Sequence, residues 1–405
     1  MEIMDSMNSF FADMLGKLNV TAEAYQTFFP PETKLDDIQA MVDQNTFPTL
    51  EGLAPAFTWC IILTIARYFL HYLAFKPLAE TTMKIREVPL IAIPDIDKAF
   101  PKAKDYVEPT SVKAYCQTSG RKALDVKKYL WTRRRNSVTK ARIVKYVEAL
   151  WRFIFYSTFC VLGYYVLFVP TTAAWIIDSN EYFEGWPLHP MSAAILLYYQ
   201  VELGCYMHQL MWTEVSRSDA LEMIAHHLIT IALIVISYLT NYMRFGVSVL
   251  FLHDLADVVL ESAKVLNYIS KAKEHKWLST IVDGLFGVFA VTFFVTRLVL
   301  FPRYILYVIC VDGWAIYGCE WGGCYFFIGF LMALQCLHIF WFYLIMRMVV
   351  KMVFVGTIEK DERSDDEDDD VADEFTEAVY DHQSSSSSSS SSDVSKKEGD
   401  TKKKK

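Results

Sequence analysis

The sequence lacks the cysteine and histidine patterns that usually hold metal ions. Its eight cysteines include no CxxC pair and no cysteine–histidine spacing of a zinc site. Its nine histidines form none of the HxxxH or HxxHH boxes that membrane di-iron enzymes carry. We therefore predict a protein with no metal site and no bound cofactor.

We also expect no secretory signal peptide, because residues 1–5 contain no basic segment and no apolar core follows them. Apolar side chains, in contrast, are abundant: 53% of the 405 residues are hydrophobic and 15% are aromatic. Several apolar runs can cross about 30 Å of hydrocarbon. We predict an all-α polytopic membrane protein with about seven transmembrane helices, at 54–75, 147–169, 192–212, 223–241, 245–268, 279–301 and 326–349.

The spans divide the chain into five parts. We expect a lumenal N-terminal segment (1–53), a first span (54–75), a basic cytoplasmic loop (76–145), a six-span domain (146–350) and a disordered tail (351–405). The tail alone accounts for the net charge of −8, since it holds 16 acidic and 8 basic residues from Thr357 onward. It is low in apolar groups and rich in serine, which predicts disorder.

Charge placement predicts the orientation. The loop at 76–145 holds 17 Lys and Arg against 7 Asp and Glu, whereas the loops at 170–191 and 302–325 hold one basic residue, Arg303. The positive-inside rule then gives a lumenal N-terminus and a cytoplasmic C-terminus. On that orientation the sequon at Asn19 is lumenal and open to glycosylation. The tail's Lys402 to Lys405 resembles an endoplasmic reticulum retrieval signal, and Ser364 and Ser395 have the spacing of acidophilic kinase sites.

The predicted fifth span contains a row of four charged residues. Asp254, Asp257, Glu261 and Lys264 recur at steps of three and four, so they lie along one face of a helix. Each costs about 2.5–3.5 kcal/mol near mid-bilayer unless it faces a protein interior or a wet cavity. Glu261 and Lys264 can form an i, i+3 ion pair, but the two aspartates have no cation on their own helix.

The preceding span supplies two adjacent histidines, His226 and His227. A turn of a few residues near Asn241 joins the two spans, so they form an antiparallel hairpin with neighbouring faces. A single histidine in a span is often only a satisfied core residue, whereas a pair beside two intramembrane aspartates suggests chemistry. Imidazole acts as a nucleophile or a general base near neutral pH, and a carboxylate partner fixes its tautomer.

These residues resemble the ceramide synthase family of TLC-domain proteins. The resemblance rests on Arg217-Ser218-Asp219, Met223 to Thr230, His253 to Lys264, and Thr296 to Pro302, in the family's order and spacing. It implies N-acylation of a sphingoid long-chain base by a fatty acyl-CoA co-substrate at the endoplasmic reticulum. It also implies His226, His227, Asp254 and Asp257 as catalytic residues, supported by Arg217, Asp219, His253, Glu261 and Lys264. Membrane lipid is a further expected partner, and a homodimer or heterodimer is compatible with the sequence.

Two other segments extend the resemblance. Residues 129–136, leading into 149–153, resemble the end of the Hox-like segment of animal-type ceramide synthases, but Arg134 stands where a base-reading Asn is expected. The three helices of a homeodomain are hard to find upstream, so we predict no nucleic-acid partner. In the family, the acyl-chain pocket ends near the lumenal loop, here 309–325. That loop holds Cys310, Cys319 and Cys324, and either free thiols or a Cys319–Cys324 disulfide fits it.

Two other functions have to be weighed against an enzyme. The first is a TLC protein that senses or carries lipid without chemistry, against which the full set of histidines and aspartates argues. The second is a transporter with a proton relay, which is expected to show inverted repeats and broken helices. Neither feature is visible in the sequence.

Overall fold

The computed structural model describes residues 8–9, 29–30, 32–101, 109–169, 179–212, 219–273, 276–317 and 322–355. The chain divides into two compact units. Of the described residues, those up to 84 and from 144 onward belong to the first unit, and those in 85–143 belong to the second. Helix α8 (Ala123–Phe168) begins in the second unit and continues into the first.

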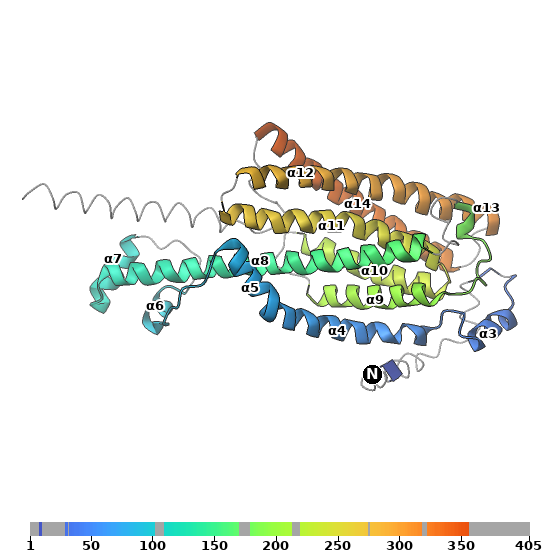
Figure 1. Cartoon of the computed structure of the whole chain (residues 1–405), viewed down its shortest axis with the longest axis horizontal. Coiled ribbons are helices and arrows are strands. Elements are labelled where there is room, and N and C mark those ends of the chain that lie inside the picture. Colours follow the sequence, from blue (N-terminus) through green and yellow to red (C-terminus); the bar gives the residue numbers. More distant parts are fainter. Residues whose placement is uncertain are drawn as a thin grey trace, which may run out of the picture. The chain divides into compact units, whose positions relative to one another are not determined.

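The first unit is a bundle of long helices that lie side by side (Figure 1). Helix α4 packs against α9, α9 against α10, α10 against α11 and α14, and α11 against α12. The bounds are α4 (Ala54–Leu70), η2 (His71–Phe75), α5 (Lys76–Met83), α9 (Ala193–Met211), α10 (Ala220–Leu239), α11 (Met243–Lys273), α12 (Lys276–Phe293), η5 (Phe294–Leu306), η6 (Val308–Asp312), α13 (Gly313–Tyr317) and α14 (Gly322–Val355). Two short elements, α3 (Leu35–Asp43) and η1 (Leu50–Leu53), precede α4.

Among the described residues, five stretches are long and apolar enough to cross a membrane: Leu50–Met83, Ala123–Phe168, Ala220–Leu239, Trp277–Ile316 and Tyr325–Phe354. This confirms the prediction of an all-α polytopic membrane protein, and the count of seven stays a prediction. The two remaining predicted spans fall on α9 and α11, which pack inside the same bundle. Both carry charged side chains that lower their hydropathy, including Glu202 on α9 and four charges on α11.

Two predicted boundaries differ from the structure. Helix α8 begins at Ala123, well before the predicted span at 147, so part of the basic loop is helical. After α12 the chain stays helical to Tyr317 through the wide turns of η5 and η6, although a lumenal loop was predicted from 302. Pro302 has no N–H to donate and disfavours a regular α-helix, and wider turns accommodate it. Cys310 therefore lies in a helix, as a half-buried free thiol.

The hairpin between α10 and α11 is confirmed. Helix α10 ends at Leu239 and α11 begins at Met243. Asn241 makes the turn in the left-handed region (φ 56°), and its side-chain amide donates to the carbonyls of Pro187 at 2.7 Å and His189 at 2.9 Å. The stacked rings of Trp186 and Tyr242, 4.6 Å apart, complete an aromatic cover over this end of the bundle.

His189 lies in this aromatic cover and should make the stability of the protein depend on pH. Burial, with Arg244 nearby, lowers the pKa of His189 from 6.5 to about 3. The folded protein therefore keeps the imidazole neutral, while the unfolded chain binds a proton below pH 6.5. The contribution of His189 to the free energy of unfolding is therefore largest above pH 6.5. Below pH 6.5 it falls by about 1.4 kcal/mol per pH unit.

We expect the thermal midpoint of the detergent-solubilised protein to fall between pH 7 and pH 5. The fall should be smaller in His189→Gln, which has no group titrating there. Equal falls in the two proteins would show that His189 does not contribute.

The second unit has a small core of its own. Helices α6 (Pro94–Ala99) and α7 (Pro109–Ser119) pack with the start of α8 around Ile96, Val112, Val126 and Tyr129. Three helices are present here. They are hard to find in the sequence because α6 and α7 are too short for their apolar periodicity to stand out. Asn136 uses its amide to bind both backbone groups of Val88, at 2.9 and 2.7 Å, so it holds the fold together locally.

Candidate active site

Helix α10 presents the two histidines to different neighbours. It begins after Asp219, which is 4% exposed. His226 is half-buried, with its ring centroid 5.2 Å from Trp341 on α14 and 6.2 Å from His253 on α11. His227 is buried beside Tyr206 of α9, at 6.0 Å. The hairpin thus brings His226 and His253 together, as predicted for neighbouring faces.

His253 is held in one tautomer by its neighbours. Its Nδ1 lies 2.6 Å from the Val249 carbonyl, which can only accept, so Nδ1 carries the proton. Nε2 of His253 therefore accepts, and Nε2 of His338 donates to it at 2.8 Å. His338 is fully buried in α14 and was missed by the sequence reading, although it is the only histidine in the last span.

The cation that pairs with Asp257 lies on another element, η5. Arg297 of η5 donates to the Asp257 Oδ2 at 3.3 Å and to the His253 carbonyl at 2.9 Å. Its guanidinium also lies over the Phe293 ring, with the Cζ 4.7 Å from the ring centroid. Arg297 is 4% exposed. Arg297 belongs to the segment Thr296 to Pro302, on which the family resemblance partly rests. The spacing of charges within one helix could not show that Arg297 pairs with Asp257.

Asp254 faces the opposite neighbour, α9. Its carboxyl group interacts with that of Glu202, and each residue is 1% exposed. Glu202 is a second residue that the sequence reading missed. The available signal was a single acidic residue in the middle of the otherwise apolar span 192–212.

Glu261 and Lys264, the last two of the four charged residues on this face of α11, belong to a group of ion pairs. Lys264 Nζ lies 2.8 Å from Glu261 Oε1, and Arg152 of α8 lies 3.8 Å from the same oxygen. The predicted pairing of Glu261 and Lys264 is confirmed. Arg152 adds a tie between α11 and the transmembrane part of α8.

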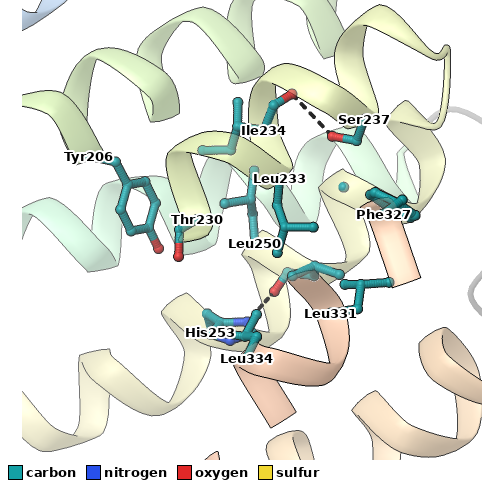
Figure 2. A pocket seen from close by; sticks show the side chains of 12 residues that line it. Tyr206, Thr230, Leu233, Ile234, Ser237, Leu250, His253, Phe327, Leu331 and Leu334 are labelled. Atoms are coloured by element: carbon teal, nitrogen blue, oxygen red, sulfur yellow. Dashed lines mark hydrogen bonds between the residues drawn. The ribbon is translucent and has the colours of Figure 1, made fainter. Parts of the chain in front are cut away.

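A small, mostly apolar cavity lies between α9, α10, α11 and α14 (Figure 2). His253, Tyr206 and Thr230 lie toward one end, and Ser237 and Phe327 lie toward the other. The wall between them is apolar, and it is formed by Leu233, Ile234, Val249, Leu250, Leu331 and Leu334. From Thr230 to Ser237 is about 10 Å along a helix axis, so the apolar wall extends over the length of several methylene groups.

Gly246 is required at the end of this cavity near Ser237. A Cβ at this position would lie 1.7 Å from the Tyr199 hydroxyl, which contacts the Ser237 hydroxyl at 3.1 Å and donates to the Met243 carbonyl at 3.2 Å. The end is therefore closed by a buried hydrogen-bonded group.

Several predicted sites lie outside the described residues. These are Arg217, the sequon at Asn19, Ser364, Ser395, Cys319 and the side chain of Cys324. Within the described ranges, no group of three His, Cys, Asp or Glu is arranged to hold a metal ion. The absence of a metal from the reaction stays a prediction.

Fold and site together define a polytopic α-helical membrane protein with buried histidines and carboxyl groups beside an apolar cavity. Residues 145–347 match the family model of the TLC domain. The chain is 37% identical to human ceramide synthase 5 over 58% of each chain, and it spans less than two thirds of that relative. It is 32% identical to human ceramide synthase 3 over 84% of this chain and 86% of the relative. Ceramide synthase LOH2 of Arabidopsis thaliana is 35% identical over 58% of this chain and 79% of the relative.

The chain therefore belongs to the ceramide synthase family of TLC-domain proteins, as the sequence resemblance predicted. The acyltransferase class predicted from the sequence is the class of this family.

Proposed function

We propose that this protein transfers a fatty acyl group from acyl-CoA to the amine of a sphingoid long-chain base, giving ceramide or dihydroceramide and CoA. One observation supports this most strongly. The apolar cavity ends at His253 and Tyr206, and the His226 ring lies 6.2 Å from the His253 ring and 6.4 Å from the Tyr206 ring. A fatty chain in the cavity would place its carboxyl end beside the His226 imidazole.

His226 is the proposed nucleophile. Its Nδ1 is buried and has no hydrogen-bond partner among the described residues, so its lone pair is not engaged. Attack of an imidazole nitrogen on the thioester carbon forms a C–N bond and breaks the C–S bond, and the leaving thiolate takes the imidazole proton. The alternative is that His226 acts as a general base and the amine attacks the thioester directly.

The second half of the reaction consumes the amine. Its lone pair forms the amide bond to the acyl carbon while the bond to imidazole breaks, and the imidazole regains a proton. His227 is the proposed partner of His226. Asp254 and Asp257 are the proposed residues that orient the site and accept the amine's surplus proton.

The membrane arrangement is part of the proposal. A lumenal N-terminus and a cytoplasmic C-terminus in the endoplasmic reticulum place the basic segment 76–145 in the cytosol, where acyl-CoA is found. The 17 basic residues of that segment suit the phosphates of CoA or of anionic lipid. Glycosylation at Asn19 tests this orientation, because the sequon can be modified only in the lumen.

Lipid analysis tests the function directly. A cell line without endogenous ceramide synthase activity, expressing this chain, should regain ceramide from an added long-chain base. Expression of a stable, membrane-inserted protein without ceramide would contradict the proposal and favour a lipid sensor or carrier.

Phe327 is expected to limit the length of the acyl chain. Its side chain closes the cavity opposite His253, is 1% exposed and stacks on Tyr242 at 5.4 Å. Phe327→Ala opens this end, so longer acyl chains can be buried. Each added methylene gains about 0.8 kcal/mol, roughly a fourfold change in preference.

The product distribution, measured with a mixture of acyl-CoA lengths, should shift to longer ceramides in Phe327→Ala. Phe326→Ala is the matched control, because the adjacent ring is exposed. An unshifted distribution in an active Phe327→Ala protein would place the end of the acyl site elsewhere.

A further inference from the structure

We infer that Glu202 and Asp254 together form the binding site for the ammonium group of the long-chain base, with Glu202 as a substrate-binding residue. This inference rests on the proposed function. It assigns a role to a buried carboxyl group that the acyl-transfer steps do not otherwise use.

The first support is the lack of a protein counter-ion. Within the described residues, the cations of the bundle interior interact with other carboxylates: Arg297 with Asp257, and Lys264 and Arg152 with Glu261. The interactions that act on Glu202 and Asp254 come from each other, from Asp257, and from the neutral groups of Tyr198 and Cys160. Two neighbouring carboxyl groups in a buried site do not both ionise, because their like charges repel, so the pair holds at most one negative charge. That charge fits a single ammonium group.

The second support is a set of buried polar atoms that interact only with one another. Within the described part of the chain, no other polar group hydrogen-bonds to Glu202 Oε1, Asp254 Oδ2 or the Tyr198 hydroxyl. Tyr198 is fully buried, lies one helical turn before Glu202 and interacts electrostatically with both carboxyl groups. Three converging acceptors suit an ammonium group, which has three donors. The Tyr198 hydroxyl can alternatively donate to a hydroxyl group of the long-chain base.

The third support is position. Glu202 lies one turn before Tyr206 on α9, and Asp254 follows His253 on α11. Tyr206 and His253 form the polar end of the cavity. An amine at the carboxyl pair is therefore adjacent to the place where the acyl carbon would lie on His226.

The site also accounts for the proton that must leave the substrate. A long-chain base arrives as an ammonium ion, which has no lone pair for attack. One N–H proton passes to a carboxylate oxygen of the pair, the freed lone pair forms the amide C–N bond, and the bond from the acyl carbon to its leaving group breaks. The nitrogen's second proton goes to that leaving group, imidazole or thiolate, so charge and atoms balance.

The test separates binding of the base from acylation of the enzyme. In Glu202→Gln, we expect the KM for sphinganine to rise about 10- to 100-fold, as expected for one lost charge-assisted hydrogen bond. CoA release from acyl-CoA in the absence of base should be unchanged. Glu202→Asp should recover part of the loss, and Glu184→Gln, an exposed carboxyl group outside the site, should match the wild type.

A second measurement needs no variant. N,N-dimethylsphinganine keeps the positive charge but cannot form the amide, and an analogue with a hydroxyl group in place of the amine is uncharged. The wild type should be inhibited at least about tenfold more strongly by the ammonium compound. Equal inhibition of the wild type by the two compounds would overturn the inference, even though the wild type makes ceramide. An unchanged KM for sphinganine in Glu202→Gln would also overturn it. Failure of the wild type to make any ceramide would instead overturn the proposed function.

Discussion

His226→Ala is expected to lower ceramide formation by at least 10²- to 10⁴-fold, on the order of magnitude known for loss of a catalytic acid or base. A larger loss is expected if the imidazole carries the acyl group, because His253, the histidine that lines the cavity, cannot replace it. His253 Nδ1 is engaged by Val249, and its Nε2 accepts from His338. Lipid analysis of null cells expressing the variant measures the effect.

Protein level and membrane insertion must be measured alongside activity. His71→Ala is a matched control, because it removes a histidine that is not part of the proposed site. His71 lies in η2, with its ring 4.7 Å from that of Tyr72. His227→Ala, Asp254→Ala and Asp257→Ala should also lose most activity while still inserting. Normal ceramide formation by a well-expressed His226→Ala protein would exclude His226 from the chemistry.

Intact-mass measurement distinguishes the two roles of His226. Purified enzyme given acyl-CoA without a long-chain base should gain the mass of one acyl group, and His226→Ala should not. A fully competent enzyme that gains no mass would contradict the acyl-imidazole intermediate. General-base catalysis by the same histidine would then be the mechanism.

The sequence predicted the features that depend on one helix or on one short turn. Length and hydropathy predicted the membrane helices, and the brief gap near Asn241 predicted the hairpin. The i, i+3 spacing predicted the Glu261–Lys264 pair, because residues at that spacing share a helix face. Each of these features is local in the chain.

The sequence could not predict which distant side chains meet. Glu202 lies 52 positions before Asp254, and His338 lies 85 positions after His253. Helix packing brings these groups together, and periodicity within one span contains no information on the neighbour that its polar face meets. The continuation of α12 past Pro302 was missed for a different reason. Proline normally ends a helix, and wide turns that accommodate it have no clear sequence signal.

Arg297→Leu is expected to destabilise the protein by about 3–5 kcal/mol, the usual cost of removing one partner of a buried ion pair. The guanidinium joins η5 to α11 through the Asp257 carboxylate and the His253 carbonyl. Its loss removes the cation of Asp257 and a brace beside the cavity. The stability of Arg297→Lys should lie between those of the wild type and Arg297→Leu, because an ammonium group keeps the positive charge but not the planar guanidinium that lies over the Phe293 ring.

The yield and thermal midpoint of the protein in detergent measure this loss. Arg303→Leu is the matched control on the same element, since Arg303 is exposed and lies over the rings of Tyr304 and Tyr307. It should change stability by no more than about 1 kcal/mol. A thermal midpoint of Arg297→Leu equal to that of the wild type would show that the pair does not hold η5 on α11.

The double variant Arg297→Leu/Asp257→Leu separates structure from chemistry. Replacing both members of a buried ion pair with apolar side chains is often neutral or stabilising, because neither charge then has to be desolvated. We therefore expect the double variant to recover most of the stability lost in Arg297→Leu. Ceramide formation should stay low, because the proposed reaction needs the Asp257 carboxylate. Recovery of both stability and activity would mean that Asp257 serves the fold alone.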